Sequence, residues 1–254
     1  MCAMLLNILK KDIKYRVDDV LDNYIIRKQL GEGRYGITYL AENKNGELFT
    51  VKQLKKSMLS KTLEKVKYES MILEELGDVK SSFFPKYISN FKDKYREGYI
   101  LEYIDGKTFE EILYEDKVVF EKEKIYKIAL ELIEMIKILE SKNIVHKDIR
   151  VTNVIYTKDE SLKLIDFGLA RYVDNKNYKR DLDYWYISDF LIHLHYSIFN
   201  TKRDLFQKKK AWYDELDLLP KEKEVLMSMM GIGNKKYNDI SEIEIDIKEI
   251  MLAI

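Results

Sequence analysis

The chain of 254 residues has a single cysteine, two prolines and no excess of charge of one sign. Because Cys2 stands alone, a framework of disulfides within the chain is excluded, and a reducing, cytoplasmic setting is the simplest expectation. Lysine plus arginine and aspartate plus glutamate each number 44. No bulk positive field therefore favours nucleic acid or an anionic membrane surface as a partner.

Long apolar runs and targeting signals are also missing. The apolar run over residues 1–9 is short, and its lysines follow it, whereas a signal peptide carries them before it. No other stretch approaches membrane-spanning length, so we expect no membrane span. With 46% hydrophobic and 35% charged residues, the length suits a soluble globular protein of one large domain or two lobes.

The first part of the chain has the apolar spacing of a helix. Over residues 4–21, the apolar positions that recur at this spacing are Leu5, Ile8, Leu9 and Ile13. We therefore expect residues 1–23 to form a helical extension packed on the body of the protein. A helix that docks a partner, or one that lies on a membrane surface, is the alternative.

Residues 143–170, NIVHKDIRVTNVIYTKDESLKLIDFGLA, concentrate the polar groups that could do chemistry. Asn153 stands five positions after Asp148, and a predicted hairpin with strands over 154–156 and 162–165 leads to Asp166. This order brings two carboxylates and an amide near one another. Such oxygen groups suit a hard divalent cation and the activation of a hydroxyl nucleophile. A loop with ordinary turn acids is the plainer interpretation.

A glycine-rich stretch, GEGRYGIT at residues 31–38, carries the pattern GxGxxG. It lies between predicted strands over 24–30 and 38–41, whereas a dinucleotide-binding GxGxxG opens a helix. The context favours a glycine-rich hairpin, in which backbone N–H groups approach phosphates without obstruction by side chains.

Together these motifs resemble the eukaryotic-like Ser/Thr protein kinase family. Residues 146–153 are similar to the kinase catalytic loop H-R-D-x-x-x-x-N, and residues 166–168 read D-F-G. The likeness runs from residue 24 to about residue 254. It implies an α+β bilobal fold, with a small β-rich N-lobe carrying one main helix over residues 24–103 and a mostly helical C-lobe over residues 104–254.

Lys52 lies in the sequence FTVK, where kinases have V-A-I-K. A lysine in a strand is usually solvated, but one flanked by Val51 after a glycine hairpin favours contact with phosphates. Glu69 falls on the apolar face of a predicted helix, whose other positions are Leu63, Val66, Leu73 and Leu76. A carboxylate on a buried stripe needs a cation, so we predict an ion pair with Lys52, as the resemblance implies. A surface glutamate paired along its own helix is the alternative.

The stretch YILEYIDGKTF at residues 99–109 resembles the strand and hinge that join kinase lobes. The resemblance implies that Leu101 is the gatekeeper residue and that Glu102 and Tyr103 lend backbone groups to the purine. Core packing is the alternative for Leu101 and Tyr103. The resemblance implies ATP as the nucleotide. Thr38 and Thr50 replace the usual Val and Ala that flank adenine, so GTP is an alternative.

The resemblance also assigns roles in phosphoryl transfer. Lys52, paired with Glu69, would contact the α- and β-phosphates, and Asp148 would orient and deprotonate the acceptor hydroxyl. Arg150 occupies the place of the catalytic-loop lysine of Ser/Thr kinases and would neutralise the moving phosphoryl group. Asn153 and Asp166 would hold Mg²⁺, with Mn²⁺ as an alternative. The hairpin residues implied to surround the phosphates are Gly31, Glu32, Gly33 and Gly36.

Several departures from the family pattern bear on regulation and substrate. Lys147 replaces the arginine of H-R-D, which in regulated kinases pairs with a phosphate on the activation segment. The segment from Gly168 to Asp183 is about half the usual length, has no Ser or Thr, and is followed by no A-P-E motif. We therefore predict that Ser/Thr phosphorylation of this segment does not switch the enzyme on.

Three functional hypotheses follow. The favoured one is ATP-dependent, Mg²⁺-assisted transfer of a phosphoryl group to a Ser/Thr hydroxyl of a protein substrate of unknown identity. The short activation segment supports a second, a kinase-like phosphotransferase that acts on a small molecule. The third is a nucleotide-binding scaffold, against which the complete catalytic set argues.

The remaining chain is predicted to be mostly helical. Residues 124–141 and 183–198 read as helices, the second similar to the opening of the buried kinase F helix, with Ser188 where Gly is usual. His193 and His195 are interpreted as packed or surface residues of that helix. Residues 240–254 read as a helix capped by Ser241, although the alternation of three isoleucines also fits a strand.

Overall fold

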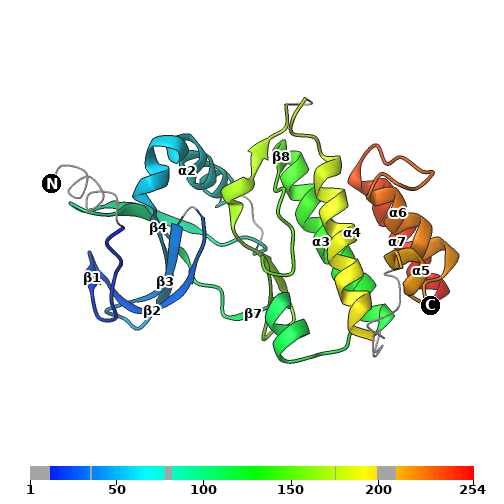
Figure 1. The fold of residues 1–254 in the computed structure, drawn as a ribbon, viewed down its shortest axis with the longest axis horizontal. Helices are drawn as coiled ribbons and strands as arrows, with labels where there is room; N and C mark the ends of the chain where they lie inside the picture. Colours follow the sequence, from blue (N-terminus) through cyan, green and yellow to red (C-terminus); the bar gives the residue numbers. More distant parts are fainter. Residues whose placement is uncertain (1–11, 35, 78–81, 175, 199–209) are drawn as a thin grey trace. The chain divides into compact units, whose positions relative to one another are not determined.

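The computed structural model describes residues 12–34, 36–77, 82–174, 176–198 and 210–254. The chain divides into two compact units, residues 1–104 and residues 105–254 (Figure 1). The first unit is rich in strands and the second is mostly helical. The α+β class expected from the sequence is therefore present, and each unit is considered by itself.

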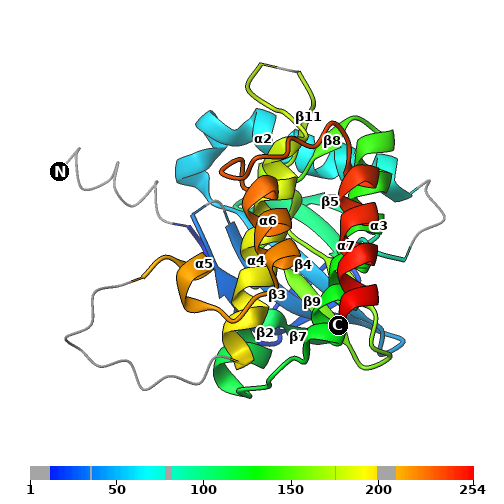
Figure 2. The same ribbon diagram turned by 90° about the vertical axis from the view of Figure 1, so that its right-hand side faces the viewer.

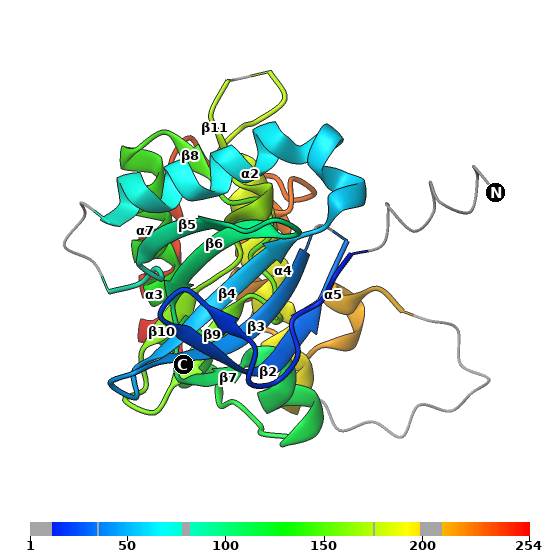
Figure 3. The same cartoon turned by 90° about the vertical axis from the view of Figure 1, so that its left-hand side faces the viewer.

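The first unit contains one antiparallel sheet of six described strands in the order β1-β2-β3-β4-β6-β5. The helix α2 (Lys56–Gly77) follows β4 and contacts β5 (Figure 3). In chain order the strands are β1 (Val20–Leu21), β2 (Tyr24–Glu32), β3 (Gly36–Asn43), β4 (Leu48–Leu54), β5 (Tyr87–Lys92) and β6 (Glu97–Glu102).

Both faces of this sheet are used, because successive side chains of a strand point to opposite faces. In β4, Val51 belongs to a buried apolar cluster, whereas its neighbour Lys52 reaches Glu69 of α2. The cluster gathers residues from the chain before the sheet as well as from its strands: Tyr15, Leu21, Ile26, Ile37, Tyr39, Ala41, Val51, Phe91 and Ile100. The face of β4 that does not carry the lysine is thus covered by the N-terminal part of the chain.

The helix expected over residues 4–21 is wrong for the part that the structure describes. Residues 12–19 are irregular, with a turn at 17–18, and residues 20–21 form β1, paired with β2. The rest of the expected helix, residues 4–11, lies outside the described residues. An extended chain advances about 3.3 Å per residue and a helix only about 1.5 Å. The extended form lets Tyr15 contact the sheet while Asp12 reaches α2.

Most of the described part of the second unit is built from four long helices: α3 (Lys122–Ser141), α4 (Asp181–Ile198), α6 (Pro220–Met229) and α7 (Ile240–Ala253). The short α5 (Trp212–Glu215) precedes α6, and a π-helical turn, η1 (Glu111–Glu115), precedes α3. The helix α3 lies beside α4 and α7, and α6 contacts both α4 and α7 (Figures 1 and 2). The apolar face predicted for α3 is buried, at Ile125, Ile128, Leu132, Ile136 and Leu139.

Short strands of the second unit frame the loops that carry its polar residues. The strands β9 (Val154–Thr157) and β10 (Leu162–Leu164) form the predicted hairpin, and β7 (Gly106–Thr108) pairs with β9. β8 (Ile144–Val145) pairs with β11 (Arg171–Tyr172), and the single 3₁₀ turn η2 (Phe167–Leu169) lies between β10 and β11. The loop after β8 and the end of β10 therefore meet beside the same hairpin.

The structure of residues 240–254 decides between the helix and strand expectations and corrects the predicted helix cap. Residues 240–253 are helical, so the strand alternative is wrong. The cap is Asp239, whose carboxylate accepts the backbone N–H groups of Ser241 and Glu242, and Ser241 is not the cap. Among the described residues, no helix combines the length and the apolar character needed to cross a membrane.

Candidate catalytic site

In the first unit, Lys52 of β4 and Glu69 of α2 form the predicted ion pair. Lys52 Nζ lies 2.6 Å from Glu69 Oε1, and Glu69 is only 5% exposed. The interpretation of Glu69 as a surface residue is therefore wrong. Pairing a buried carboxylate with an ammonium group offsets the cost of removing it from water. The ammonium group also lies 5.8 Å from the ring centre of Tyr99 in β6.

Two glycines allow the strands around Lys52 to pack closely. A Cβ on Gly36 would lie 2.7 Å from the carbonyl oxygen of Gln53, and one on Gly98 would lie 2.0 Å from that of Lys52. Both positions therefore need glycine. Gly31 and Gly33 differ, since a Cβ on either would have no atom within 4 Å. Their lack of side chains leaves open space beside the backbone at the glycine-rich hairpin.

Glu32 lies between those open glycines, and its side chain is already engaged. Its carboxylate pairs with the ammonium groups of Lys14 and Lys55, the second at 2.7 Å. The hydrogen bond from Lys14, followed by that from Lys55, holds the pKa of Glu32 below its usual value. A phosphate contact from this residue would therefore come from its backbone.

The residues expected around a purine lie on neighbouring strands of the sheet. Leu101 of β6 is 5% exposed and is the direct partner of Thr50 in β4, while Thr38 in β3 is the partner of Lys52. The backbone N–H of Glu102 donates to the carbonyl of Lys86 at 2.8 Å. Glu102 would therefore offer its carbonyl, rather than its N–H, to a base. Tyr103 follows β6 and is half-buried.

In the second unit, the carboxylate of Asp148 is held from two sides. Arg150 contacts both of its oxygens, with Nε at 2.6 Å from Oδ1 and Nη2 donating to Oδ2 at 3.0 Å. Asn153 Nδ2 donates to the same Oδ2 at 2.8 Å and to the backbone carbonyl of Asp148 at 2.9 Å. Asp148 is 6% exposed, so two donors fix the orientation of a nearly buried carboxylate. The same pairing raises the pKa of the Arg150 guanidinium.

Asp183 of α4 is hydrogen-bonded to the backbone of this loop. Its carboxylate accepts the backbone N–H groups of His146 and Lys147, each at 2.7 Å. Lys147 has a φ of 66°, a left-handed conformation that costs free energy for a residue with a side chain, and these hydrogen bonds offset that cost. Burial raises the pKa of Asp183 to about 7. The sequence predicted Asp183 only as the start of a helix. The feature that could have indicated its role is an acidic residue at the N-terminal end of an apolar helix.

Asp166 stands where β10 turns into η2. It is exposed, with φ 64° and ψ 72°, while the next residue, Phe167, is fully buried with its ring edge-on to His146 at 4.6 Å. The backbone N–H of Ile165 donates to the carbonyl of Asn153 at 2.9 Å. This bond ties the end of β10 to the catalytic loop, so the two predicted metal ligands lie on directly linked segments.

The chemistry of these two residues fits Mg²⁺. Both side chains carry hard oxygens, and because the amide nitrogen of Asn153 is bound to Asp148, its amide oxygen would be the ligating group. The described part of the chain contains no group of three or more His, Cys, Asp or Glu side chains placed to hold a metal. A set of two protein oxygens matches Mg²⁺, which is usually bound through one or two carboxylates together with substrate phosphates.

The segment after Phe167 is tied to residues 143–147 by side-chain contacts. The ammonium group of Lys147 lies 4.3 Å from the ring centre of Tyr178, and Arg180 Nη2 donates to Asn143 Oδ1 at 3.1 Å. Asp174 accepts the backbone N–H groups of Lys176, Asn177 and Tyr178, and these bonds lower its pKa. Sequence reasoning did not find the Lys147–Tyr178 contact, because nothing in the spacing of the two residues marks it.

Comparisons with known proteins agree with this geometry. A family model described as the protein kinase domain matches residues 24–207. The chain is 29% identical over 238 residues to the probable serine/threonine-protein kinase YbdM of Bacillus subtilis (strain 168), covering 91% of this chain and 90% of that protein. It is 33% identical over 165 residues to serine/threonine-protein kinase D of Synechocystis sp., covering 60% of this chain and 31% of the relative.

A third relative, the dual specificity protein kinase zakA of Dictyostelium discoideum, is 28% identical over 155 residues, which is 61% of this chain and 20% of that protein. The chain thus spans most of one relative and less than a third of the other two. The chain belongs to the protein kinase domain family, in its eukaryotic-like serine/threonine form, and is a protein kinase transferase.

Proposed function

We propose that this kinase transfers the γ-phosphoryl group of ATP to a Ser or Thr hydroxyl of a protein, with Asp148 as the base. The observation that carries the proposal is the arrangement around Asp148: a nearly buried carboxylate oriented by Asn153 and paired with Arg150. An oriented carboxylate can accept a hydrogen bond from the acceptor hydroxyl and take its proton as the new P–O bond forms. The leaving group is ADP.

Arg150 has two tasks in this proposal. It pairs with Asp148, and its side chain is about half exposed, so it can also face an incoming phosphoryl group. The negative charge of the transition state is spread over the phosphoryl oxygens, and a fixed cation stabilises it. Because a guanidinium binds in a planar fork, a lysine at this position would not reproduce both contacts with Asp148.

Lys52 and the glycine-rich hairpin would bind the nucleotide. Glu69 holds the ammonium group of Lys52 in place, and that group would contact the α- and β-phosphates. The open backbone at Gly31 and Gly33 would add N–H donors, with Glu32 and Gly36 completing the hairpin. Leu101, Glu102 and Tyr103, with Thr38 and Thr50, would surround the base.

Asn153 and Asp166 would hold Mg²⁺, or Mn²⁺ in its place. When bound, the cation neutralises phosphate charge and orients the transferred group. The protein would contribute the two oxygens, and the bond between Ile165 and Asn153 links the segments that carry them.

Transfer of label from γ-labelled ATP tests the proposal. Purified protein would be incubated with Mg²⁺ or Mn²⁺, with generic proteins as acceptors and, separately, with a pool of small molecules. We expect label on Ser or Thr of protein, and none with Asp148→Ala, Lys52→Ala or Asp166→Ala. Label confined to the small-molecule fraction would instead support the second hypothesis, for which the short activation segment speaks. ATP binding with no transfer to any acceptor would support the scaffold hypothesis.

A further inference from the structure

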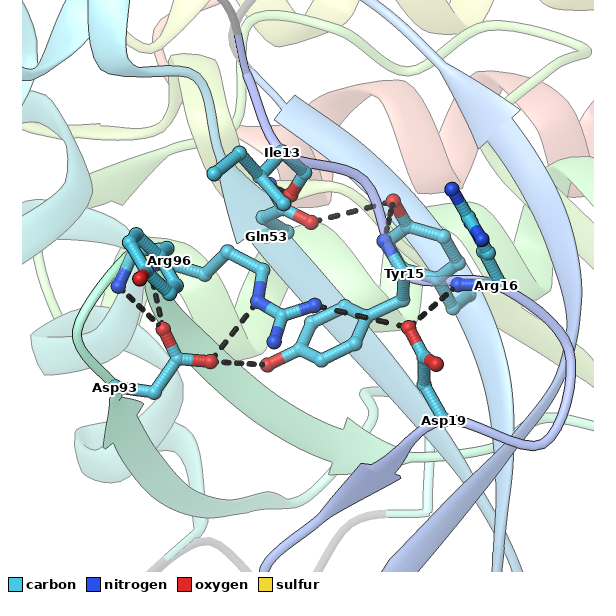
Figure 4. Close-up of polar contacts among 9 residues, drawn as sticks. Ile13, Tyr15, Arg16, Asp19, Gln53, Asp93 and Arg96 are labelled. Carbon is cyan, nitrogen blue, oxygen red and sulfur yellow. Dashed lines mark hydrogen bonds and ion pairs between the residues drawn. The ribbon is translucent and has the colours of Figure 1, made fainter. Parts of the chain in front are cut away.

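Residues 12–16, which we name the N-terminal strap, bind three parts of the first unit within five residues of chain. Figure 4 labels Ile13, Tyr15 and Arg16 of the strap and shows the hydroxyl of Tyr15 pointing toward the carboxylate of Asp93. The strap belongs to none of the sequence motifs discussed above, and it lies on the face of the sheet opposite Lys52. Its contacts nevertheless lead to α2, to the glycine-rich hairpin and to the residue that follows Lys52.

Tyr15 anchors the strap. Its side chain is 5% exposed and packs edge-on against the rings of Tyr39 and Phe91. Its hydroxyl donates to Asp93 Oδ2 at 3.3 Å, and the guanidinium of Arg96 lies 3.6 Å from its ring centre (Figure 4). A buried aromatic residue with a satisfied hydroxyl and a stacked cation fixes the position of the chain on either side of it.

Gln53 connects the strap to the strand that carries Lys52. Its amide nitrogen donates to the carbonyl of Ile13 at 3.0 Å, and its amide oxygen accepts from the hydroxyl of Tyr39 at 3.2 Å. That hydroxyl in turn accepts the backbone N–H of Tyr15 at 3.2 Å. Gln53 is 1% exposed and is the residue after Lys52 in β4. The strap is therefore hydrogen-bonded to the direct chain neighbour of the lysine in the ion pair.

Asp12 supplies an acidic hydrogen-bond acceptor, which the first turn of α2 lacks. The first turn of α2 contains no acidic residue, and its first backbone N–H, that of Lys56, donates to Asp12 Oδ1 at 2.6 Å. An acceptor and a negative charge at this end satisfy one open N–H and favour the helix dipole. Lys14 of the same strap pairs with Glu32 in the glycine-rich hairpin, which Lys55, just before α2, also contacts.

We propose that the N-terminal strap is a positioning segment for phosphoryl transfer: it fixes α2 and the glycine-rich hairpin to β4, and thereby keeps Glu69 on Lys52. The inference rests on the proposed function for its effect on turnover, but its effect on α2 is independent of it. Asp12, Lys14 and Tyr15 are positioning residues, since none of them is placed to touch the nucleotide.

Asp12→Ala in the full chain tests the proposal, and Asp12→Asn is its matched control. Asparagine accepts a helix N-terminal N–H about as well as aspartate, whereas alanine cannot. We expect kcat to fall about threefold to tenfold in Asp12→Ala, within the range of one lost helix cap, and to recover most of its value in Asp12→Asn. The fraction of folded protein, followed by circular dichroism at the assay temperature, is expected to be equal in all three proteins.

Amide hydrogen exchange separates a failure of the strap from a failure of the proposed function. We expect the amides of α2 to exchange about tenfold faster in Asp12→Ala and in Tyr15→Ala than in the unchanged chain, with Tyr15→Phe close to the unchanged chain. Unaltered exchange in α2, or a loss of activity that merely tracks the unfolded fraction, would overturn the proposal. If the unchanged chain transfers no phosphoryl group, only the proposed function falls, and the exchange rates still decide the role of the strap.

Discussion

The two units hold their proposed catalytic residues in opposite ways. In the first, Lys52 and Glu69 are 17 positions apart and come from a strand and a helix, so their contact depends on where α2 packs. In the second, Asp148, Arg150 and Asn153 lie within six residues of one loop and bond to one another. The geometry of the second set is local, whereas that of the first is assembled from distant segments. An external influence on α2 would therefore reach the first set far more easily than the second.

The residues that hold these two sets in place also differ: one is a buried residue of a helix, and the other is a residue of a preceding segment. The catalytic loop rests on Asp183, which is buried in α4 and bonded to two backbone N–H groups of the loop. In the first unit, the start of α2 is held by Asp12, from a segment that precedes the sheet. A change at Asp12 is thus expected to reach the ion pair, while the loop keeps its form.

The largest effect is expected at Asp148, because its neighbours cannot replace a base. In Asp148→Asn the amide has no basic oxygen to take the proton, so we expect kcat to fall by about 10²- to 10⁴-fold in a steady-state kinase assay. The melting temperature should change little, since the local loop contacts are partly kept. Asp159→Asn, in the exposed turn of the β9–β10 hairpin, is the control and should keep full activity. Near-normal turnover in Asp148→Asn would remove Asp148 as the base.

Glu69→Gln is expected to have the next largest effect and bears directly on the contrast between the units. Removing one partner of a buried ion pair leaves Lys52 uncompensated and is expected to destabilise the first unit by about 3 kcal/mol. We expect kcat/KM for ATP to fall by roughly tenfold to a hundredfold, because Lys52 loses its fixed position. Glu74→Gln, an exposed change on the same helix, should leave both quantities unchanged. A full effect on stability with none on kcat/KM would mean that the pair is only structural.

Lowering the pH is expected to reduce the unfolding free energy of the second unit because His195 becomes protonated on unfolding. Burial lowers the pKa of His195 to about 4, although Glu222 beside it favours the charged form and Lys122 opposes it. The hydroxyl of Tyr126, which is also titratable, lies 3.3 Å from the Nε2 of His195. Between pH 6.5 and about 4 the unfolded chain binds a proton that the folded chain does not, so stability falls as the pH falls. The loss expected from this residue is about 3 kcal/mol.

Urea unfolding at pH 7 and pH 4.5 measures this effect. The difference in unfolding free energy between the two pH values should shrink in His195→Gln, and it should stay unchanged in His193→Gln, which alters a more exposed histidine of the same helix. An equal pH dependence in all three proteins would show that His195 does not titrate differently on folding.

The smallest effect is expected at Tyr178. Tyr178→Leu removes the ring beneath Lys147, a contact worth about 0.5–1 kcal/mol at a partly exposed site, whereas Tyr178→Phe keeps it. We expect faster amide exchange over residues 171–174 in the first variant only. Treating the unchanged protein with a phosphatase should leave its activity unaltered, because the segment is tied down by this ring and by Asp174. Loss of activity on phosphatase treatment, or activation by a phosphate on Tyr172 or Tyr178, would contradict that view.

The sequence predicted the parts of the site that depend on short-range order. Glu69 was found because its place on an apolar helical face demanded a cation, and the catalytic loop because its residues are close in the chain. The N-terminal helix was wrong because apolar spacing carries no information about Tyr15, whose partners Tyr39 and Asp93 are 24 and 78 positions away. Asp183 was seen as a helix start, but its bonds to a loop 36 positions earlier could not be read from spacing.

The contact between Gly98 and the backbone of Lys52 has a consequence for how this sequence can vary. Gly98 belongs to none of the motifs by which the catalytic residues were recognised, yet any Cβ there would meet the Lys52 carbonyl oxygen at 2.0 Å. In a library that replaces each residue in turn, position 98 should accept glycine alone, as strictly as a residue that touches substrate. Intolerance of substitution at this position would thus record the packing of two strands and would be mistaken for chemistry if the structure were not consulted.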